Sequence, residues 1–369
     1  MGETLRLTPL HAEHRAADGK LVPFAGYELP VQYPTGITAE HNAVRSAAGL
    51  FDVSHMGEFE ITGAGALDLV QYLCSNDAAE LEVGQAQYST LPRVDGGLLD
   101  DLLVYRMSDR YMLVVNASNR DKDLDWIAGF ATRFGVRVTD RSDELALLAL
   151  QGPRAPEVLS GLTPIDLAGI DYYRFEEGEV DGRSAIVSRT GYTGEDGFEL
   201  YVGAADAVPI WRRILSVGQD TGVIPAGLGA RDSLRLEMGY ALYGNDLDEG
   251  RTPLEAGLAW VTRLDKTDFV AGEALRRQKA DGVREKLVGF KLLERGFPRP
   301  GYEIAQAGRT VGTVTSGTLS PSLGIGIGMG YVPSELARPG TLLEVVIRGQ
   351  AVPAEVQRPP FYTSGSIRR

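Results

Sequence analysis

Two adjacent aspartates, Asp100 and Asp101, stand in an apolar run that follows the turn sequence Asp95-Gly96-Gly97 and ends at Tyr105. The run predicts a buried strand, and strand side chains alternate between two faces, so the two acids are expected on opposite faces. The apolar residues are divided in the same way: Asp100 is expected with Leu98, Leu102 and Val104, and Asp101 with Leu99, Leu103 and Tyr105. Carboxylates are rarely buried without a partner, because desolvating an unpaired charge is costly. Either one acid caps a turn while the other pairs with an arginine, or Asp101 and Tyr105 face a cleft and take part in chemistry.

Length and glycine content set the scale of the fold. A chain of 369 residues predicts two or three domains with ample core. Its 45 glycines exceed the average share of about 7%, which predicts many tight turns and a body rich in strands.

Charge and cysteine usage exclude several classes of protein. With 50 acidic and 37 basic residues the formal net charge is −13, so a nucleic-acid partner is not expected. Cys74 is the single cysteine, which excludes an intrachain disulfide and a thiol-rich zinc site. His11 and His14 lack an obvious third ligand, and we expect a solvated turn there rather than a metal site. No signal pattern or long apolar run is present, so we expect a soluble cytoplasmic protein without a membrane partner.

Hydrophobic period and turn signals predict the elements of the first 275 residues. Residues 1–35 are expected to be irregular. Helices are predicted over 38–48 with Thr38 as N-cap, 64–73, 121–134 with Asn119 as N-cap, and 208–215. Strands are predicted over 50–61, 86–91, 98–105, 111–115, 145–150 and 184–188, and the second and third of them form a hairpin.

The C-terminal part has a different character. The charged, turn-prone stretch 276–282 is a candidate linker, so that residues 1–275 form one region and residues 283–369 another. Short strands alternate with turns up to Arg358, which predicts a small β-barrel or sandwich. Glycines fall on every second residue over 324–330 with no helix after them, so this stretch is no dinucleotide-binding loop. We expect them to permit close backbone packing instead.

The remaining candidate site residues suit a flat aromatic ligand. The glycine-rich loop 188–197 leads into a strand on which Glu199 and Tyr201 face away from the apolar side chains. On a helix over 230–238, Arg231 and Arg235 lie on one stripe and could reach the same partner. A plain hairpin and a pair of salt bridges are the simpler interpretations. The alternative is a binding site in which a carboxylate accepts the N–H groups of the ligand edge, an arginine meets negative charge and tyrosines stack on the ring; these tyrosines are Tyr88, Tyr173, Tyr192 and Tyr240.

Four segments together resemble the aminomethyltransferase (T-protein) family of the glycine cleavage system. They are Phe51-Asp52-Val53-Ser54-His55-Met56-Gly57, Gly97-Leu98-Leu99-Asp100-Asp101-Leu102, Arg189-Thr190-Gly191-Tyr192-Thr193-Gly194-Glu195-Asp196-Gly197, and Gly229-Ala230-Arg231-Asp232-Ser233-Leu234-Arg235-Leu236-Glu237. The resemblance implies an α+β, three-domain, ring-like folate-dependent fold with a C-terminal β-barrel-like domain, in which residues 1–275 hold two interleaved α+β subdomains.

The same resemblance implies an activity and its residues. A methylene group would pass from the aminomethyl group on the lipoyl arm of a carrier, the H-protein, to tetrahydrofolate, giving 5,10-methylenetetrahydrofolate and ammonia. Tetrahydrofolate would be a co-substrate, with no metal, flavin or nicotinamide. Asp101 would be the catalytic acid and would stabilise the positive charge that develops as ammonia departs. The implied folate and substrate contacts are Met56, Tyr88, Tyr105, Asn116, Tyr173, Tyr192, Glu199, Arg231, Tyr240 and Tyr362. A pterin edge resembles half a guanidinium, which the Glu199 carboxylate can accept through two hydrogen bonds.

One departure and three rival functions accompany this interpretation. Some members of the family carry arginine after the C-terminal aromatic pair, where this chain has Thr363, so Tyr362 is a weaker substitute there. A folate-dependent demethylase of N-methyl amino acids often carries a fused flavin domain, for which this chain has no fingerprint. A non-catalytic folate-binding relative carries a cysteine motif where this chain has Arg189-Thr190-Gly191-Tyr192. A purely structural adaptor for the carrier would leave Asp101 without a role.

Overall fold

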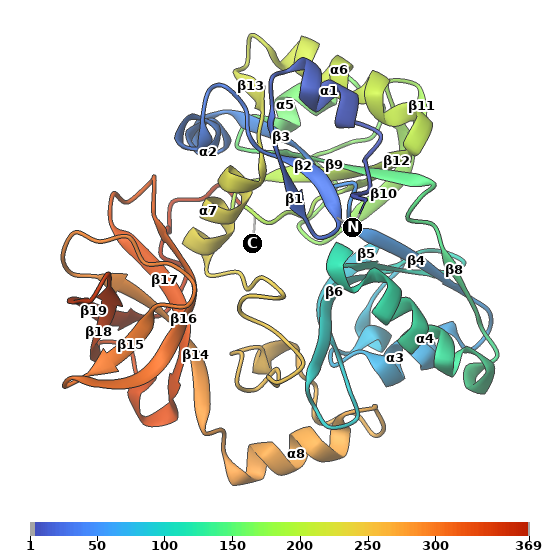
Figure 1. The fold of residues 1–369 in the computed structure, drawn as a ribbon. Helices are drawn as coiled ribbons and strands as arrows, with labels where there is room; N and C mark the ends of the chain where they lie inside the picture. Colours follow the sequence, from blue (N-terminus) through green and yellow to red (C-terminus); the bar gives the residue numbers. More distant parts are fainter. Residues whose placement is uncertain (1–3, 368–369) are drawn as a thin grey trace.

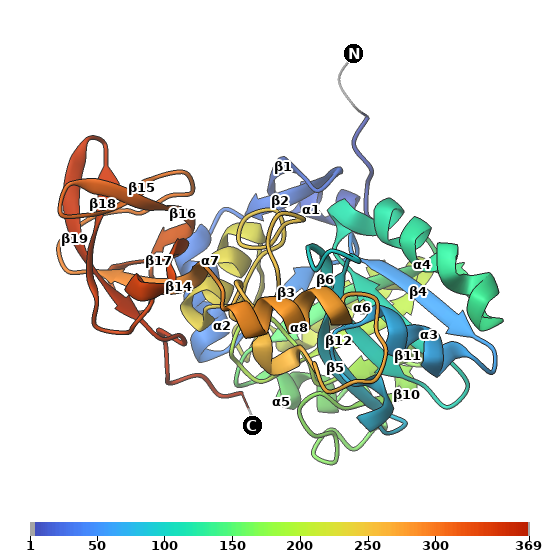
Figure 2. The same ribbon diagram turned by 90° about the horizontal axis from the view of Figure 1, so that it is seen from below.

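The computed structural model describes residues 4–367, which form three bodies around a common centre (Figure 1). Two of them are mixed layers of helix and sheet, and the third is a closed barrel at the C-terminal end. The predicted α+β class with a C-terminal barrel is therefore confirmed. Figure 2 shows from below that the barrel stands apart from the other two bodies, which overlap in this view.

The first body is a six-stranded sheet with helices on its outer face. Its strands run in the order β10-β11-β12-β9-β3-β13 and pair antiparallel except for β13 with β3. Their bounds are β3 Ala48–Asp52, β9 Leu145–Gln151, β10 Phe175–Val180, β11 Arg183–Ser188, β12 Gly197–Gly203 and β13 Val223–Pro225. The outer helices are α1 His11–Ala16, α5 Ala155–Ser160 and α6 Ala207–Gly218. Trp211 on α6 packs with Phe198 and Leu200 of β12 in the core between them.

The second body is a five-stranded sheet covered by two helices. Its order is β5-β6-β7-β4-β8, with bounds β4 Gly57–Thr62, β5 Gln85–Pro92, β6 Leu98–Arg106, β7 Tyr111–Val115 and β8 Arg137–Asp140. The helices α3 Ala66–Leu73 and α4 Arg120–Phe134 bury its outer face. The predicted β5–β6 hairpin and the β7 strand are confirmed. Asn119 is the N-cap residue of α4 as predicted, but its side chain makes no capping hydrogen bond and donates to Asp100 instead.

The alternation predicted for β6 holds from Asp100 onward and fails before it. A bulge pairs Leu91 with Asp100 and Pro92 with Leu98, which leaves Leu99 as an extra residue on β6. Leu99 consequently packs with Leu102 in the outer core, while Leu98 packs on the other side with Leu247. The two aspartates keep their predicted opposite faces.

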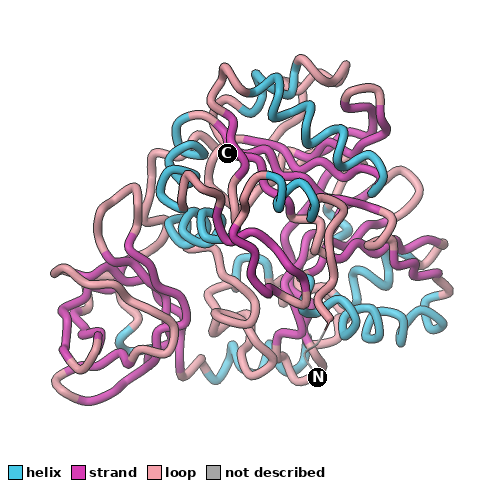
Figure 3. The backbone as a smooth tube through the Cα atoms, turned by 45° about the horizontal axis from the view of Figure 1, so that its top comes forward, coloured by secondary structure: helices cyan, strands magenta, loops and turns pink. Residues whose placement is uncertain are grey.

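The inner faces of the two sheets meet in a shared core, and this is where the site lies. Phe51, Leu147 and Tyr201 come from the first sheet, and Tyr105 and Val114 from the second. Two further helices close this core, α2 Ile37–Ser46 and α7 Leu228–Met238. Figure 3 shows how the two groups of strands approach each other.

Three predictions for the N-terminal part are wrong. The sequence predicts an irregular segment over 1–35, but its described residues 4–35 are largely regular, with α1 followed by the hairpin of β1 Lys20–Phe24 and β2 Tyr27–Gln32. The single strand predicted over 50–61 is two strands in different sheets, because the Ser54 amide donates to the Asp52 side chain and turns the chain after β3. Helix α2 begins after Gly36 without a side-chain cap, so Thr38 is not its N-cap.

The third body is a closed six-stranded barrel. It contains β14 Glu285–Leu292, β15 Glu303–Gln306, β16 Arg309–Leu319, β17 Gly326–Pro333, β18 Leu342–Ile347 and β19 Gln350–Gln357. The predicted role of the alternating glycines is confirmed: a Cβ on Gly328 would come within 2.4 Å of Phe290, and one on Gly330 within 2.5 Å of a backbone oxygen. The stretch 276–282 is not turn-prone, since most of it belongs to helix α8 Gly272–Asp281, which leads to the barrel (Figure 1).

Helix α7 joins the barrel to the body. It ends at Gly239, which has φ +69° and whose Cβ, if present, would clash with Pro359 at 2.2 Å. Arg235 on α7 is paired with the buried Asp246 at 2.9 Å and donates to Ser316 of β16. The predicted common partner of Arg231 and Arg235 is not found, because Arg231 faces a cavity on the other side of the helix.

Candidate active site

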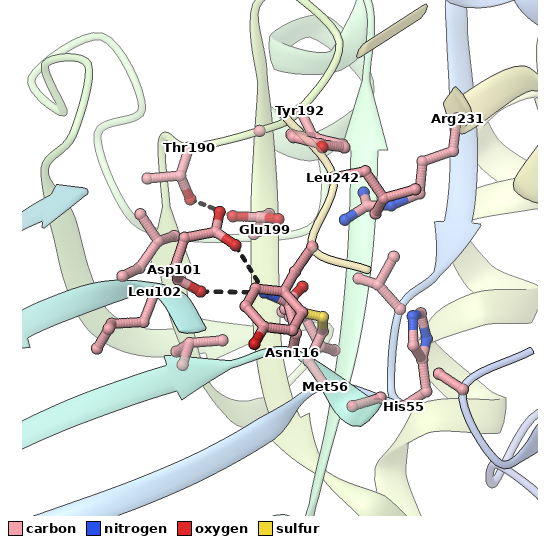
Figure 4. Close-up of a pocket in the computed structure, with 18 of the residues that line it drawn as sticks. His55, Met56, Asp101, Leu102, Asn116, Thr190, Tyr192, Glu199, Arg231 and Leu242 are labelled. Atoms are coloured by element: carbon pink, nitrogen blue, oxygen red, sulfur yellow. Dashed lines mark hydrogen bonds between the residues drawn. The ribbon is translucent and has the colours of Figure 1, made fainter. Parts of the chain in front are cut away.

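A cavity lies where the inner faces of the two sheets meet α7, the turn between β1 and β2, and the segment 241–243 (Figure 4). Eight of the eleven residues predicted for the site line it. They are Met56, Tyr88, Asp101, Asn116, Tyr173, Tyr192, Glu199 and Arg231.

The Asp101 carboxyl group is fixed by two neighbouring strands. The Tyr88 hydroxyl donates to one oxygen at 2.9 Å, and the Asn116 side-chain amide donates to the other at 3.0 Å. The strand register explains both contacts: Asn116 continues β7 at the position opposite Asp101, and Tyr88 lies diagonal to it on β5. No arginine or lysine pairs with Asp101 among residues 4–367.

The environment of Asp101 favours its protonated form. Burial and the negative charge of Asp100 raise the pKa of the Asp101 carboxyl group to about 7, against the hydrogen bonds from Tyr88 and Asn116. Asp101 therefore exchanges a proton near neutral pH. This is the range in which general acid–base catalysis is efficient.

Glu199 lies on β12 on the face predicted for it. The Thr190 hydroxyl donates to its carboxylate at 2.5 Å, and burial raises the pKa of Glu199, with Thr190 and the charge of Arg231 opposing. Behind Thr190, the fully buried Tyr105 hydroxyl lies 3.3 Å from the Thr190 hydroxyl and receives a hydrogen bond from Tyr201 at 3.0 Å. A chain of hydroxyl groups thus orients Glu199 from the protein side.

Arg231 supplies positive charge at the other side of the cavity. Its guanidinium lies 4.7 Å from the centre of the Tyr192 ring, and Tyr192 is itself stacked on Tyr240 with ring centres 5.6 Å apart. The Tyr192 hydroxyl donates to the carbonyl of Ala241, which holds the segment 241–243 over the cavity. Burial lowers the pKa of Arg231, and the nearby Tyr192 and Glu199 oppose that shift.

Three predicted residues lie outside the cavity lining. Tyr105 is fully buried behind Thr190, and Tyr240 supports Tyr192. Tyr362 covers the guanidinium of Arg45 at 4.1 Å, in the C-terminal segment beside α2 and α7.

The sequence reasoning missed other residues of the lining. Thr190 belongs to the glycine-rich motif. It lies two residues after Ser188, which pairs with Glu199 on the neighbouring strand, and this spacing could have indicated that Thr190 contacts Glu199. His55 also belongs to a motif; it is buried against the rings of Phe24 and Tyr27, and burial lowers its pKa to about 4. Leu242 and Tyr243 carried no signal, because they come from a segment without regular structure.

The histidines of the N-terminal part have internal partners. His11 lies 2.6 Å from Glu28, and the buried His14 lies 2.8 Å from Asp52. Within residues 4–367 no group of three or more potential ligands is placed to hold a metal ion. In the same range no helix has the length and apolar character needed to span a bilayer.

This arrangement suits one kind of chemistry. A carboxylate held by a hydroxyl chain can accept two N–H groups of a planar heterocycle, tyrosine rings can flank the plane, and a second acid can exchange a proton nearby.

Known proteins of one family match this chain over nearly its whole length. Residues 10–266 match the family model described as the GCVT N-terminal domain, and residues 285–363 match that of the glycine cleavage T-protein C-terminal barrel domain. The chain is 50% identical over 359 residues to an aminomethyltransferase from Desulfitobacterium hafniense, covering 97% of this chain and 98% of the relative. It is 46% identical over 361 residues to the aminomethyltransferase of Bacillus subtilis, covering 97% and 99%.

A solved structure gives the same result for the fold. The crystal structure of the glycine cleavage system aminomethyltransferase T from Bartonella henselae superposes with a TM-score of 0.93 at 35% identity. The match covers 99% of this chain and 100% of that one.

Proposed function

The chain belongs to the aminomethyltransferase (T-protein) family of the glycine cleavage system, and from that premise we propose how its cavity divides the reaction among its residues. The enzyme transfers the methylene carbon of an aminomethyl group to tetrahydrofolate and releases ammonia. The donor in our proposal is a lipoylated carrier of the H-protein type, whose arm presents the aminomethyl group on sulfur. We place the reaction in the cytoplasm, where a lone, buried, free cysteine is usual.

We propose that Glu199 binds the pterin edge of folate. Its carboxylate is buried in the cavity wall and oriented by Thr190, so it is prepared to accept two N–H groups without further reorganisation. Tyr173 and Tyr192 line the same cavity and supply ring faces for the pterin, and Arg231 offsets the Glu199 charge from across it. Met56 supplies apolar contact.

The three residues outside the lining have indirect roles in this proposal. Tyr105 orients Glu199 through Thr190, and Tyr240 supports the ring of Tyr192. Tyr362 steadies the C-terminal segment against Arg45 rather than touching folate.

The observation that carries the catalytic assignment is a single acid, Asp101, that lines the same cavity as Glu199 and has a pKa of about 7. During transfer the bond between the methylene carbon and the amine nitrogen breaks with its electron pair moving to nitrogen, which must gain a proton to leave as ammonia. The bond to sulfur breaks in the same sense, and the thiol also gains a proton. N5 and N10 of tetrahydrofolate form the two new bonds and lose one proton each, so no net proton is needed.

Asp101 is suited to pass these protons, because it is close to half protonated at neutral pH. When ionised, it stabilises the cationic carbon–nitrogen centre that develops as ammonia departs. Tyr88 and Asn116 keep its oxygens directed at the cavity during both stages.

The test is a single-turnover assay with tetrahydrofolate and aminomethyl-loaded carrier, in which ammonia and methylenetetrahydrofolate are followed together. Asp101→Asn is expected to lower the rate by roughly 10²- to 10⁴-fold and to leave folate affinity within a small factor. Asp109→Asn makes the same change at an exposed aspartate after β6 and is the matched control. An unchanged rate in Asp101→Asn would exclude this role. Folate binding without either product would redirect the search to N-methyl amino acid substrates.

A further inference from the structure

A second carboxylate lies behind the catalytic acid, on the face of the strand that is turned away from the cavity. Asp100 is fully buried on the opposite face of β6 and does not line the cavity. One of its oxygens accepts from the Asn119 side chain at 2.6 Å and from the Asn116 side chain at 2.8 Å, and the other accepts from the Asn116 backbone N–H at 2.9 Å. Three donors therefore hold this carboxylate in one orientation.

Asn116 connects the two acids across the strand. Its side-chain nitrogen lies 2.8 Å from Asp100, 3.0 Å from the Asp101 side chain and 3.0 Å from the Asp101 carbonyl oxygen. Because Asp100 also binds the Asn116 backbone, the side chain that orients Asp101 is itself positioned by Asp100. A displacement of Asp100 would pass directly to the catalytic carboxyl group.

A third acid, Asp123 on α4, stands behind Asp100 and is also fully buried. Burial and the charge of Asp100 raise the pKa of Asp123 to about 11, so Asp123 is neutral at physiological pH and its hydroxyl hydrogen bonds to Asp100. Burial raises the pKa of Asp100 as well, against the hydrogen bonds from Asp123, Asn116 and Asn119. Both Asp100 oxygens accept hydrogen bonds from N–H donors, so the geometry assigns the negative charge of this pair to Asp100.

The other ionisable groups around these acids are few. Lys122 and the Tyr243 hydroxyl face Asp123 and Asp100 from α4 and the segment 241–243. Tyr88 and Tyr192 face Asp101, and burial raises the pKa of each, so both are neutral at physiological pH. Asp100 is consequently the principal negative charge that acts on Asp101.

We propose that Asp100 is a positioning residue for the transferase reaction, which orients Asp101 through Asn116 and places a buried negative charge beside it. This inference rests on the proposed function for its catalytic meaning. Its physical content, the effect of Asp100 on the protonation of Asp101, can be measured without any substrate.

The experiment follows the carboxyl carbon of Asp101 by ¹³C NMR as a function of pH in the ligand-free full chain, and the pH dependence of the single-turnover rate in parallel. Asp100→Asn removes the charge and is expected to lower the Asp101 midpoint by at least about one pH unit, which reduces its protonated fraction at pH 7 about fivefold or more. The rate constant should fall with it, while folate affinity stays within a small factor.

Asp123→Asn is the matched control in the same network. It replaces a group that is already neutral by a neutral isostere, so the Asp101 midpoint should stay where it is in the unaltered protein. Asp100→Glu restores the charge with a longer side chain, and it should return the midpoint toward 7 with an incomplete recovery of the rate.

Each outcome decides the proposal. Equal midpoints in Asp100→Asn and the unaltered protein would overturn it, and so would equal displacements in Asp100→Asn and Asp123→Asn, which would indicate packing rather than charge. If Asp100→Asn does not fold, the unaltered protein still provides a test, because an Asp101 midpoint near 4 would overturn the proposal. A displaced NMR midpoint in an enzyme without transferase activity would refute the proposed function and leave the electrostatic inference standing.

Discussion

Replacement of Glu237 by glutamine should weaken the attachment of the barrel to the body, and the loss of stability should depend on pH. Glu237 lies in the last turn of α7 with a fully buried side chain. Arg45 donates to it at 2.7 Å from α2, and His41 lies 3.3 Å away. From the loop between β16 and β17, Ser320 donates to it at 2.5 Å and Ser322 at 2.8 Å. One carboxylate therefore binds two helices of the body and a loop of the barrel.

The size of the effect follows from the protonation of Glu237. Burial raises its pKa, but the hydrogen bond and charge of His41, the Ser320 hydroxyl and the charge of Arg45 outweigh this and hold the pKa at about 2, below the ordinary 4.5. Such a depression corresponds to about 3 kcal/mol of stability at neutral pH. Because the folded pKa is the lower one, this contribution is complete above the unfolded pKa and is lost as pH falls from about 4.5 through about 2.

The measurement is urea unfolding of the full chain and of Glu237→Gln at several pH values between 7 and 3. We expect the variant to lose about 3 kcal/mol at pH 7 and a progressively smaller amount as the pH approaches 3. Glu157→Gln, which breaks an exposed ion pair with Arg154, serves as the control and should change little. A loss at pH 7 within experimental error, or one of equal size at pH 7 and pH 3, would refute the reasoning.

Two further predictions concern the cavity. Glu199→Gln removes the charged acceptor for the pterin edge and should weaken folate binding, measured by calorimetry, roughly ten- to hundredfold. Thr190→Val removes only the orienting hydroxyl and should weaken folate binding less. An unchanged folate affinity in Glu199→Gln would contradict the pterin assignment. Trp260 is 69% exposed and stacks on Tyr88, which lines the cavity, whereas the other two tryptophans pack in the outer cores. Folate should therefore change the tryptophan fluorescence of the protein but not that of Trp260→Phe, and an equal change in both would exclude Trp260 as the reporter.

The parts of the site that the sequence predicted are those that follow from strand period. Asp101 and Glu199 face the cavity because each stands at an alternate position of an apolar strand, and this alternation could be derived from β6 and β12 alone. The functional meaning of these faces came from the motifs, since period alone also allows a plain hairpin.

The parts that could not be predicted depend on pairing between distant segments. The bulge at Leu99 results from the pairing of β5 with β6, and the turn after Asp52 separates two strands whose apolar residues read as one. Asn119 occupies the N-cap position of α4, but its side chain donates to the buried Asp100 carboxylate instead of accepting from the helix. Removing a donor from a buried carboxylate costs more free energy than leaving the first turn of a helix without a side-chain cap. Propensity gives no information about such competition.

In the proposed mechanism the two adjacent aspartates, Asp100 and Asp101, share one explanation. A charge that tunes a catalytic acid must be close to it and yet must not occupy the space where the substrates bind. The face of β6 away from the cavity meets both conditions, since Asp100 is next to Asp101 in the chain while its side chain lies in the outer layer with Asp123. The backbone between them does not block an electrostatic interaction, and the low polarity of the surroundings strengthens it. The same alternation that separates the two side chains therefore allows one to act on the other without entering the site.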